Sequence, residues 1–108
     1  MTIHLGEFEQ LILLALLRLD GDAYGVAVHD EIVRRTGRRM SYGTVYATLS
    51  RLEAKGMITS RLGEPTAERG GRRKKYFTTL APGRRALERS LQGVLRMAQG
   101  IDTSWGIS

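Results

Sequence analysis

Residues 41–62, SYGTVYATLSRLEAKGMITSRL, contain the pattern that decides the fold. Ser41 is a suitable N-cap for a helix that runs to about Lys55, and Gly56 supplies the stop. The buried stripe of this helix consists of Val45, Leu49 and Leu52. About a quarter-turn away, a narrow polar and basic ridge spanning roughly 60° consists of Thr44, Thr48, Arg51 and Lys55.

Two strand-like segments follow this helix. Residues 57–62 and 75–79 are rich in residue types that favour β-strands, and the loop between them holds Pro65, Gly70 and Gly71. The tip reads RGGRRKK at residues 69–75, where glycines permit close approach and cations can contact phosphates or a minor groove. Such a charge run is often only a solvated loop, but its place after a basic helix favours contact with a polyanion. We therefore predict a hairpin with a basic wing.

Two further helices are expected before this unit and one after it. Residues 5–19 form the first helix, and after the turn at residues 20–22 a second helix ends at Gly37. Pro82 opens a last helix that runs to about Gln99.

The order helix, helix, helix, hairpin, helix is typical of a winged helix-turn-helix. We predict a mainly α fold with a small β-hairpin, followed by a C-terminal dimerisation helix. The predicted organisation is a winged helix over residues 1–80, the dimerisation helix over 81–101 and a tail over 102–108.

Two apolar surfaces exceed what this small chain can bury alone. Residues 11–17, LILLALL, are apolar on every side of the first helix. The last helix has apolar residues at the alternating spacing of a helix–helix seam. We predict a homodimer whose contacts are made by Leu11, Leu14, Leu87, Leu91, Val94, Ala98 and Ile101.

Charge is distributed unevenly along the 108 residues, whose net charge is +6. Residues 1–33 carry a balance of −5, residues 34–75 carry +9 and residues 76–108 carry +2. The positive middle segment would attract nucleic acid or an acidic membrane surface.

Membrane insertion and secretion are not indicated. The longest apolar run, residues 11–17, is far shorter than the roughly 20 residues that cross a bilayer. The N-terminal residues lack the features of a secretory signal, and the absence of cysteine fits a reducing compartment. We expect a cytoplasmic protein without membrane contact.

The basic helix and wing together predict binding to double-stranded DNA, because a helix can enter the major groove. Thr44 is suited to base edges, whereas Arg51 and Lys55 are suited to phosphates. Tyr46 either donates its hydroxyl to a phosphate or packs half-buried. The predicted DNA-binding residues are Arg39, Ser41, Tyr42, Thr44, Tyr46, Thr48, Arg51 and Lys55 on the helix side, and Arg69, Arg72, Arg73 and Lys74 on the wing.

Metal binding and catalysis have little support in the sequence. His4 and His29 lie apart with no acidic or thiol cluster beside them, and Asp30 has no candidate nucleophile as a companion. We predict no catalytic residue, no metal site and no cofactor. A winged-helix module that meets an acidic protein surface instead of DNA is the alternative.

From residue 5 to about residue 98 the chain resembles the PadR family of bacterial transcriptional regulators, in particular its short members with one C-terminal helix. The resemblance depends on the order and spacing of short motifs: LGEFEQ at 5–10, YG at 24–25, GTVY at 43–46, RLE at 51–53, Gly56, GEP at 63–65, GGRR at 70–73, YF at 76–77 and Gly83. Where the family commonly has Leu-Thr before the last helix, this chain has Thr79-Leu80, and Thr79 is then a candidate cap.

The resemblance implies a winged-helix repressor that dimerises through its last and first helices. It also implies a pseudo-palindromic operator and release by a small molecule. Carried over to this sequence, the resemblance implies DNA contacts at Tyr42, Thr44 and Tyr46 and at residues 72–74. Effectors in the family vary between phenolic acids, multidrug compounds and none known, so a small aromatic or drug-like molecule is a candidate partner. Trp105 is a candidate ligand-binding residue because it can stack on an aromatic ring.

Overall fold

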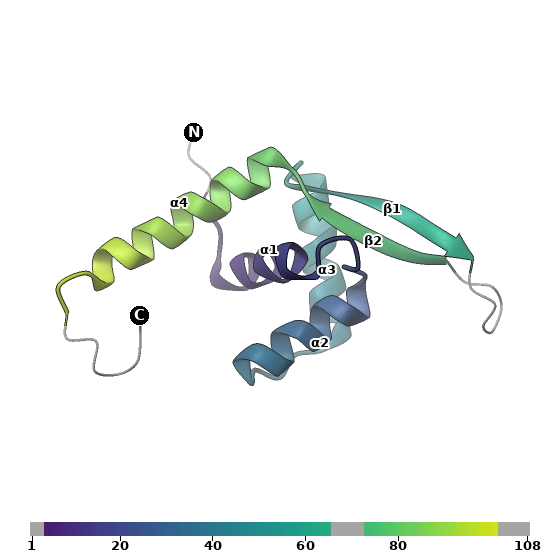
Figure 1. The fold of residues 1–108 in the computed structure, drawn as a ribbon, viewed down its shortest axis with the longest axis horizontal. Helices are drawn as coiled ribbons and strands as arrows, with labels where there is room; N and C mark the ends of the chain where they lie inside the picture. Colours follow the sequence, from purple (N-terminus) through teal and green to yellow (C-terminus); the bar gives the residue numbers. More distant parts are fainter. Residues whose placement is uncertain (1–3, 66–72, 102–108) are drawn as a thin grey trace.

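The computed structural model of the chain describes residues 4–65 and 73–101 (Figure 1). The element order is α1 (Glu7–Leu19), α2 (Gly25–Thr36), α3 (Tyr42–Ala54), β1 (Ile58–Pro65), β2 (Arg73–Thr79) and α4 (Ala81–Ala98). Strands β1 and β2 form an antiparallel hairpin in which Ile58 lies opposite Thr79. The predicted mainly α fold with a small hairpin is confirmed.

A hydrophobic core lies where α1, α2, α3 and the base of the hairpin meet. Ile12 and Leu13 of α1 are fully buried at its centre. Burying a large aliphatic side chain stabilises the fold by roughly 1.5–3 kcal/mol, so this cluster dominates folding. Other buried members are Val28, Ile32, Val45, Leu49, Leu52, Met57, Ile58, Phe77, Ala86 and Leu87. Leu11, Leu14 and Leu17 are only partly buried against it.

The turns around α3 form where the sequence predicts them. The Ser41 hydroxyl accepts a hydrogen bond from the Thr44 backbone N–H at 3.1 Å, which caps the helix. Gly37 ends α2 at φ 71° and Gly56 follows α3 at φ 75°, a left-handed backbone that favours glycine. These turns set α2 and α3 against each other as a helix-turn-helix.

The start of α4 differs from the suggestion that Thr79 caps it. Leu80 is the N-cap, with no side-chain hydrogen bond, and Pro82 lies in the first turn. Within the described part of the chain, the buried Thr79 hydroxyl has no hydrogen-bond partner. Thr79 instead ends β2, because the strand continues through the residue that the sequence offered as a cap.

The hairpin is attached to the body of the molecule near its base. The Phe77 N–H donates to the Ala23 carbonyl at 2.9 Å, and Tyr24 pairs with Tyr76 in an isolated bridge. The two tyrosine rings meet edge to face with centroids 5.7 Å apart. The Arg61 guanidinium lies 4.7 Å from the Tyr76 ring centroid, on its face. The described part of the hairpin is therefore fixed relative to α1 and α2.

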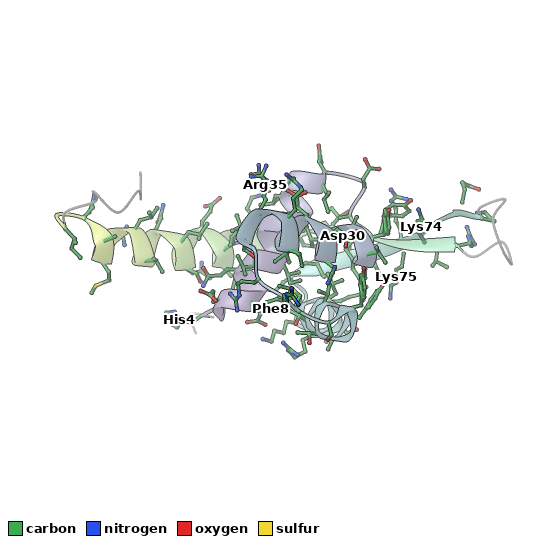
Figure 2. The ribbon with its side chains drawn as sticks, turned by 90° about the horizontal axis from the view of Figure 1, so that it is seen from below. His4, Phe8, Asp30, Arg35, Lys74 and Lys75 are labelled. Atoms are coloured by element: carbon green, nitrogen blue, oxygen red, sulfur yellow. The ribbon has the colours of Figure 1, made fainter. Side chains whose placement is uncertain are left out.

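Glu31 links α1 to α2 through a cluster of arginines. Its carboxylate accepts hydrogen bonds from Arg34 at 2.7 Å and Arg35 at 2.6 Å, and Arg18 of α1 lies 3.4 Å away. The bonds from Arg34 and then Arg35 lower the pKa of Glu31 to about 2, against a smaller rise from partial burial. Figure 2 shows Arg35 on the opposite side of the molecule from Phe8.

Helix α4 begins in close contact with the body and then leaves it (Figure 1). A Cβ on Gly83 would lie 2.3 Å from the Met57 carbonyl oxygen, so the first turn of α4 packs directly on that backbone. Ala86 and Leu87 are buried, but Val94 is 62% exposed and Met97 is 80% exposed. The distal half of α4 therefore presents apolar side chains that residues 4–65 and 73–101 leave exposed.

Candidate nucleic-acid interface

The first half of α3 presents an exposed polar surface. Tyr42 and Tyr46 are each 46% exposed, and Ser41, Gly43 and Thr44 are exposed beside them. The opposite face of the same helix holds the buried stripe predicted from the sequence. A helix that is anchored on one side and polar on the other can enter a major groove.

Thr48 does not belong to this surface, which corrects the predicted ridge. Its side chain is 1% exposed, and its hydroxyl donates to the Thr44 carbonyl at 2.9 Å. The same hydroxyl accepts a hydrogen bond from Arg51 at 3.2 Å. Thr48 is therefore not an exposed residue of this surface, and its hydroxyl instead holds the guanidinium end of the Arg51 side chain.

An open hollow of about 570 Å³ lies beside α3, between the start of α1 and the turn before α3. Its lining includes the guanidinium-bearing side chains of Arg38, Arg39 and Arg51. Phe8, labelled in Figure 2, lies on the α1 side of the hollow. A concave surface with three arginines matches the charge and fork geometry of a backbone phosphate. Arg38 was not predicted, although its position directly before the capped turn was visible in the sequence.

Acidic residues of α1 restrain two of the basic side chains at this surface. Arg38 forms an ion pair with Glu7, and the Lys55 ammonium lies 3.0 Å from Glu9. Burial raises the pKa of Glu9, but hydrogen bonds from Lys55 and from the Gly6 N–H outweigh it and lower the pKa. Lys55 is thus placed at the end of α3 by an internal partner.

Tyr46 packs half-buried, as one of its two predicted roles requires, and the phosphate contact stays a prediction. A Cβ on Gly25 would lie 2.2 Å from its ring, which means that the ring rests directly on the start of α2. The residue as a whole is still 46% exposed. This contact explains why glycine stands at position 25 and fixes the direction of the Tyr46 hydroxyl.

The described wing cations are also held in place by neighbours. Arg73 donates to the Gly63 carbonyl at 2.7 Å, and Lys74 lies 4.2 Å from the Tyr24 ring centroid. Lys75 lies 3.7 Å from Glu53, and Figure 2 shows Lys74 and Lys75 on opposite sides of β2. Arg69 and Arg72 of the predicted wing, and the predicted ligand residue Trp105, lie outside the described residues.

Residues 4–65 and 73–101 contain no group of three His, Cys, Asp or Glu side chains that could hold a metal ion. None of the helices in those ranges is long and apolar enough to cross a membrane.

A helix-turn-helix packed on one side, an exposed polar start of α3 and a basic hairpin beside it define a winged-helix protein of the DNA-binding class. The sequence model of the transcriptional regulator PadR-like family matches residues 13–89 of this chain. The chain belongs to this PadR-like family of transcriptional regulators.

Solved structures share the fold across most of the chain. A transcriptional regulator from Clostridium thermocellum superposes with a TM-score of 0.70 at 24% identity, covering 89% of this chain and 87% of that one. A PadR family transcription regulator from Clostridium difficile gives 0.67 at 23% identity, covering 92% and 99%. A PadR family regulator from Eggerthella lenta gives 0.65 at 24% identity, covering 94% and 88%.

A curated relative is more similar in sequence. An uncharacterised 37.1 kDa protein in a transposon of Streptomyces fradiae is 33% identical over 90 residues. The match covers 83% of this chain but only 24% of that protein.

Proposed function

We propose that the protein represses transcription by binding a pseudo-palindromic operator as a homodimer in the cytoplasm, without enzymatic activity. The single observation that carries this proposal is the exposed start of α3 beside the arginine-lined hollow. Thr44 and Tyr42 would meet base edges, and the arginines of the hollow would hold the adjoining phosphates. Residues 1–80 would form the DNA-binding unit.

The apolar distal half of α4 supports the homodimer. Val94, Leu95 and Met97 of α4 are more than half exposed, as is Ile101 just beyond the helix, and exposed apolar surface of this kind marks an interaction site. A twofold dimer would place the two α3 helices in successive major grooves, with half-site centres about 34 Å apart. Of the predicted dimer residues, Leu87 is buried within its own chain, so it would contribute only through the wall of the hollow that it shares with Leu91.

A small aromatic or drug-like effector would act at the same interface. A second hollow of about 570 Å³ lies between α1 and α4, lined by Leu14, Leu17, Leu87 and Leu91 together with polar residues. In a dimer this apolar wall would face the partner subunit, where a ligand could alter the approach of the two chains. Trp105 would add an aromatic surface from the tail.

Binding of fluorescent duplex DNA at several salt concentrations tests the proposal. Genomic fragments retained by the purified protein supply the sequence to be used. If the dimer neutralises roughly 6 to 10 phosphates, the log–log salt slope is expected to be about −5 to −9. Replacing Arg72 and Arg73 with Ala should make the slope shallower, whereas an unchanged slope removes the wing from the interface. Failure to retain any duplex at low salt contradicts the proposal.

A further inference from the structure

His29 of α2 lies directly beneath an exposed side chain of the DNA-reading helix. Its imidazole stacks on the Tyr42 ring with centroids 4.0 Å apart and planes 29° from parallel. The His29 side chain is 13% exposed, whereas Tyr42 is 46% exposed. One face of Tyr42 therefore rests on the imidazole, and much of the rest is open to a ligand.

Both nitrogens of the His29 ring face oxygen acceptors. Nδ1 lies 2.9 Å from Oδ1 of Asp30, and Nε2 lies 2.9 Å from the carbonyl oxygen of Met40. A neutral imidazole has one N–H, so it can satisfy only one of these acceptors, whereas the imidazolium donates to both. The hydrogen bond to Asp30 raises the pKa of His29, burial lowers it by less, and the bond to Met40 adds a further rise.

These contacts tie α2 to the start of α3. Met40 directly precedes Ser41, which caps α3, and Tyr42 is the first residue of that helix. The charged group that contacts the ring is Asp30 on α2, and the titratable group facing it from α3 is the Tyr42 phenol. When the ring loses a proton, one of its nitrogens presents a lone pair to the oxygen beside it. The hydrogen bond to either Asp30 or Met40 is then lost.

We infer that His29 is a positioning residue for DNA recognition, whose imidazolium fixes Tyr42 and the turn before α3 so that DNA binds more tightly when the ring is protonated. This inference rests on the proposed function, because it assumes that the start of α3 contacts DNA. A raised pKa means that the favourable contacts are fully present below about pH 6.5 and are lost as pH rises through the raised value.

Equilibrium binding of the same duplex at constant ionic strength, from about pH 5.5 to about pH 8.5, tests the inference. Wild type is expected to bind about fivefold more tightly at the acidic end, a modest coupling between two sites. His29→Gln should remove this dependence. His4→Gln is the matched control, because His4 is the only other histidine of the chain, and it should retain the dependence. Retention of the full pH dependence in His29→Gln would overturn the inference.

A second variant and a measurement without DNA separate this inference from the proposed function. Asp30→Asn keeps the imidazole but removes its carboxylate, so the pH transition should move to lower pH while tight binding persists below it. In the free protein, NMR signals of the Tyr42 ring should titrate together with those of His29. Tyr42 signals that ignore the His29 titration overturn the positioning role. If no duplex binds at any pH, the proposed function fails, and the NMR titration still decides whether His29 positions Tyr42.

Discussion

The first half of α3 and the distal half of α4 are both exposed, but they differ in chemistry and in support. The α3 surface is polar, flanked by arginines, and backed by buried residues on the other side of the same helix. The α4 surface is apolar and extends away from the body (Figure 1). A rigid polar surface suits a ligand with fixed charge geometry, whereas an unsupported apolar one needs another apolar surface to cover it.

The largest effect is expected from placing a charge on the apolar distal half of α4. Val94→Glu is expected to yield a monomer, because a carboxylate in an apolar seam is not compensated. DNA binding should fall by about 100-fold or more, since each chain then engages one half-site without the other. Light scattering and fluorescence anisotropy measure the two effects. Gln92→Glu is the control, because Gln92 is exposed on the same helix but polar. A fully dimeric Val94→Glu protein would contradict the assignment.

Removing one arginine beside α3, and for comparison one on α4, tests the electrostatic contribution of the α3 surface to DNA binding. Arg39→Ala should weaken binding about tenfold and reduce the salt slope by about 1 for each subunit, with little sequence preference. Arg89→Ala makes the same change in charge on exposed α4 and should leave the slope nearly unaltered. Equal effects of the two variants would show that net charge, not the hollow, governs binding.

Two threonines of α3 offer a finer test, since one is exposed and the other buried. Thr44→Val should alter base preference by about 1 kcal/mol, roughly fivefold, if its hydroxyl reads a base edge. Thr48→Val should leave the preference unchanged and cost about 1 kcal/mol of stability, because an internal hydrogen bond is lost. Binding to a library of operator variants and urea unfolding separate the outcomes. A changed preference in Thr48→Val would refute the correction made from its burial.

The smallest expected effect lies away from both surfaces, at Glu31. Its pKa of about 2 is below the value in an unfolded chain, so its stabilising contribution is present above about pH 4.5 and is lost as pH falls toward 2. Glu31→Gln should lower the melting temperature slightly at neutral pH and remove part of the loss on acidification. DNA affinity should not change. A variant with weakened DNA binding would link this cluster to the interface.

Much of the fold could be predicted because it depends on local signals. Gly37, Ser41 and Gly56 mark the helix ends through their own backbone and hydrogen-bonding properties. Thr48 was misplaced because it lies only about 60° around the helix from Val45, and the packing of neighbouring elements decides where burial ends. The stack of His29 on Tyr42 joins separate helices and leaves no periodic signal in the sequence.

The attachment of the hairpin near Tyr24 and Tyr76 has a mechanical consequence for regulation. Only Leu80 separates β2 from α4, and the first turn of α4 packs on the Met57 backbone, so the hairpin and the start of α4 are expected to move together. An 18-residue helix is about 27 Å long, so tilting it by about 5° displaces its far end by about 2 Å. In the proposed dimer, a small molecule that changes the tilt between the two α4 helices would alter the distance between the two α3 helices without distorting either subunit.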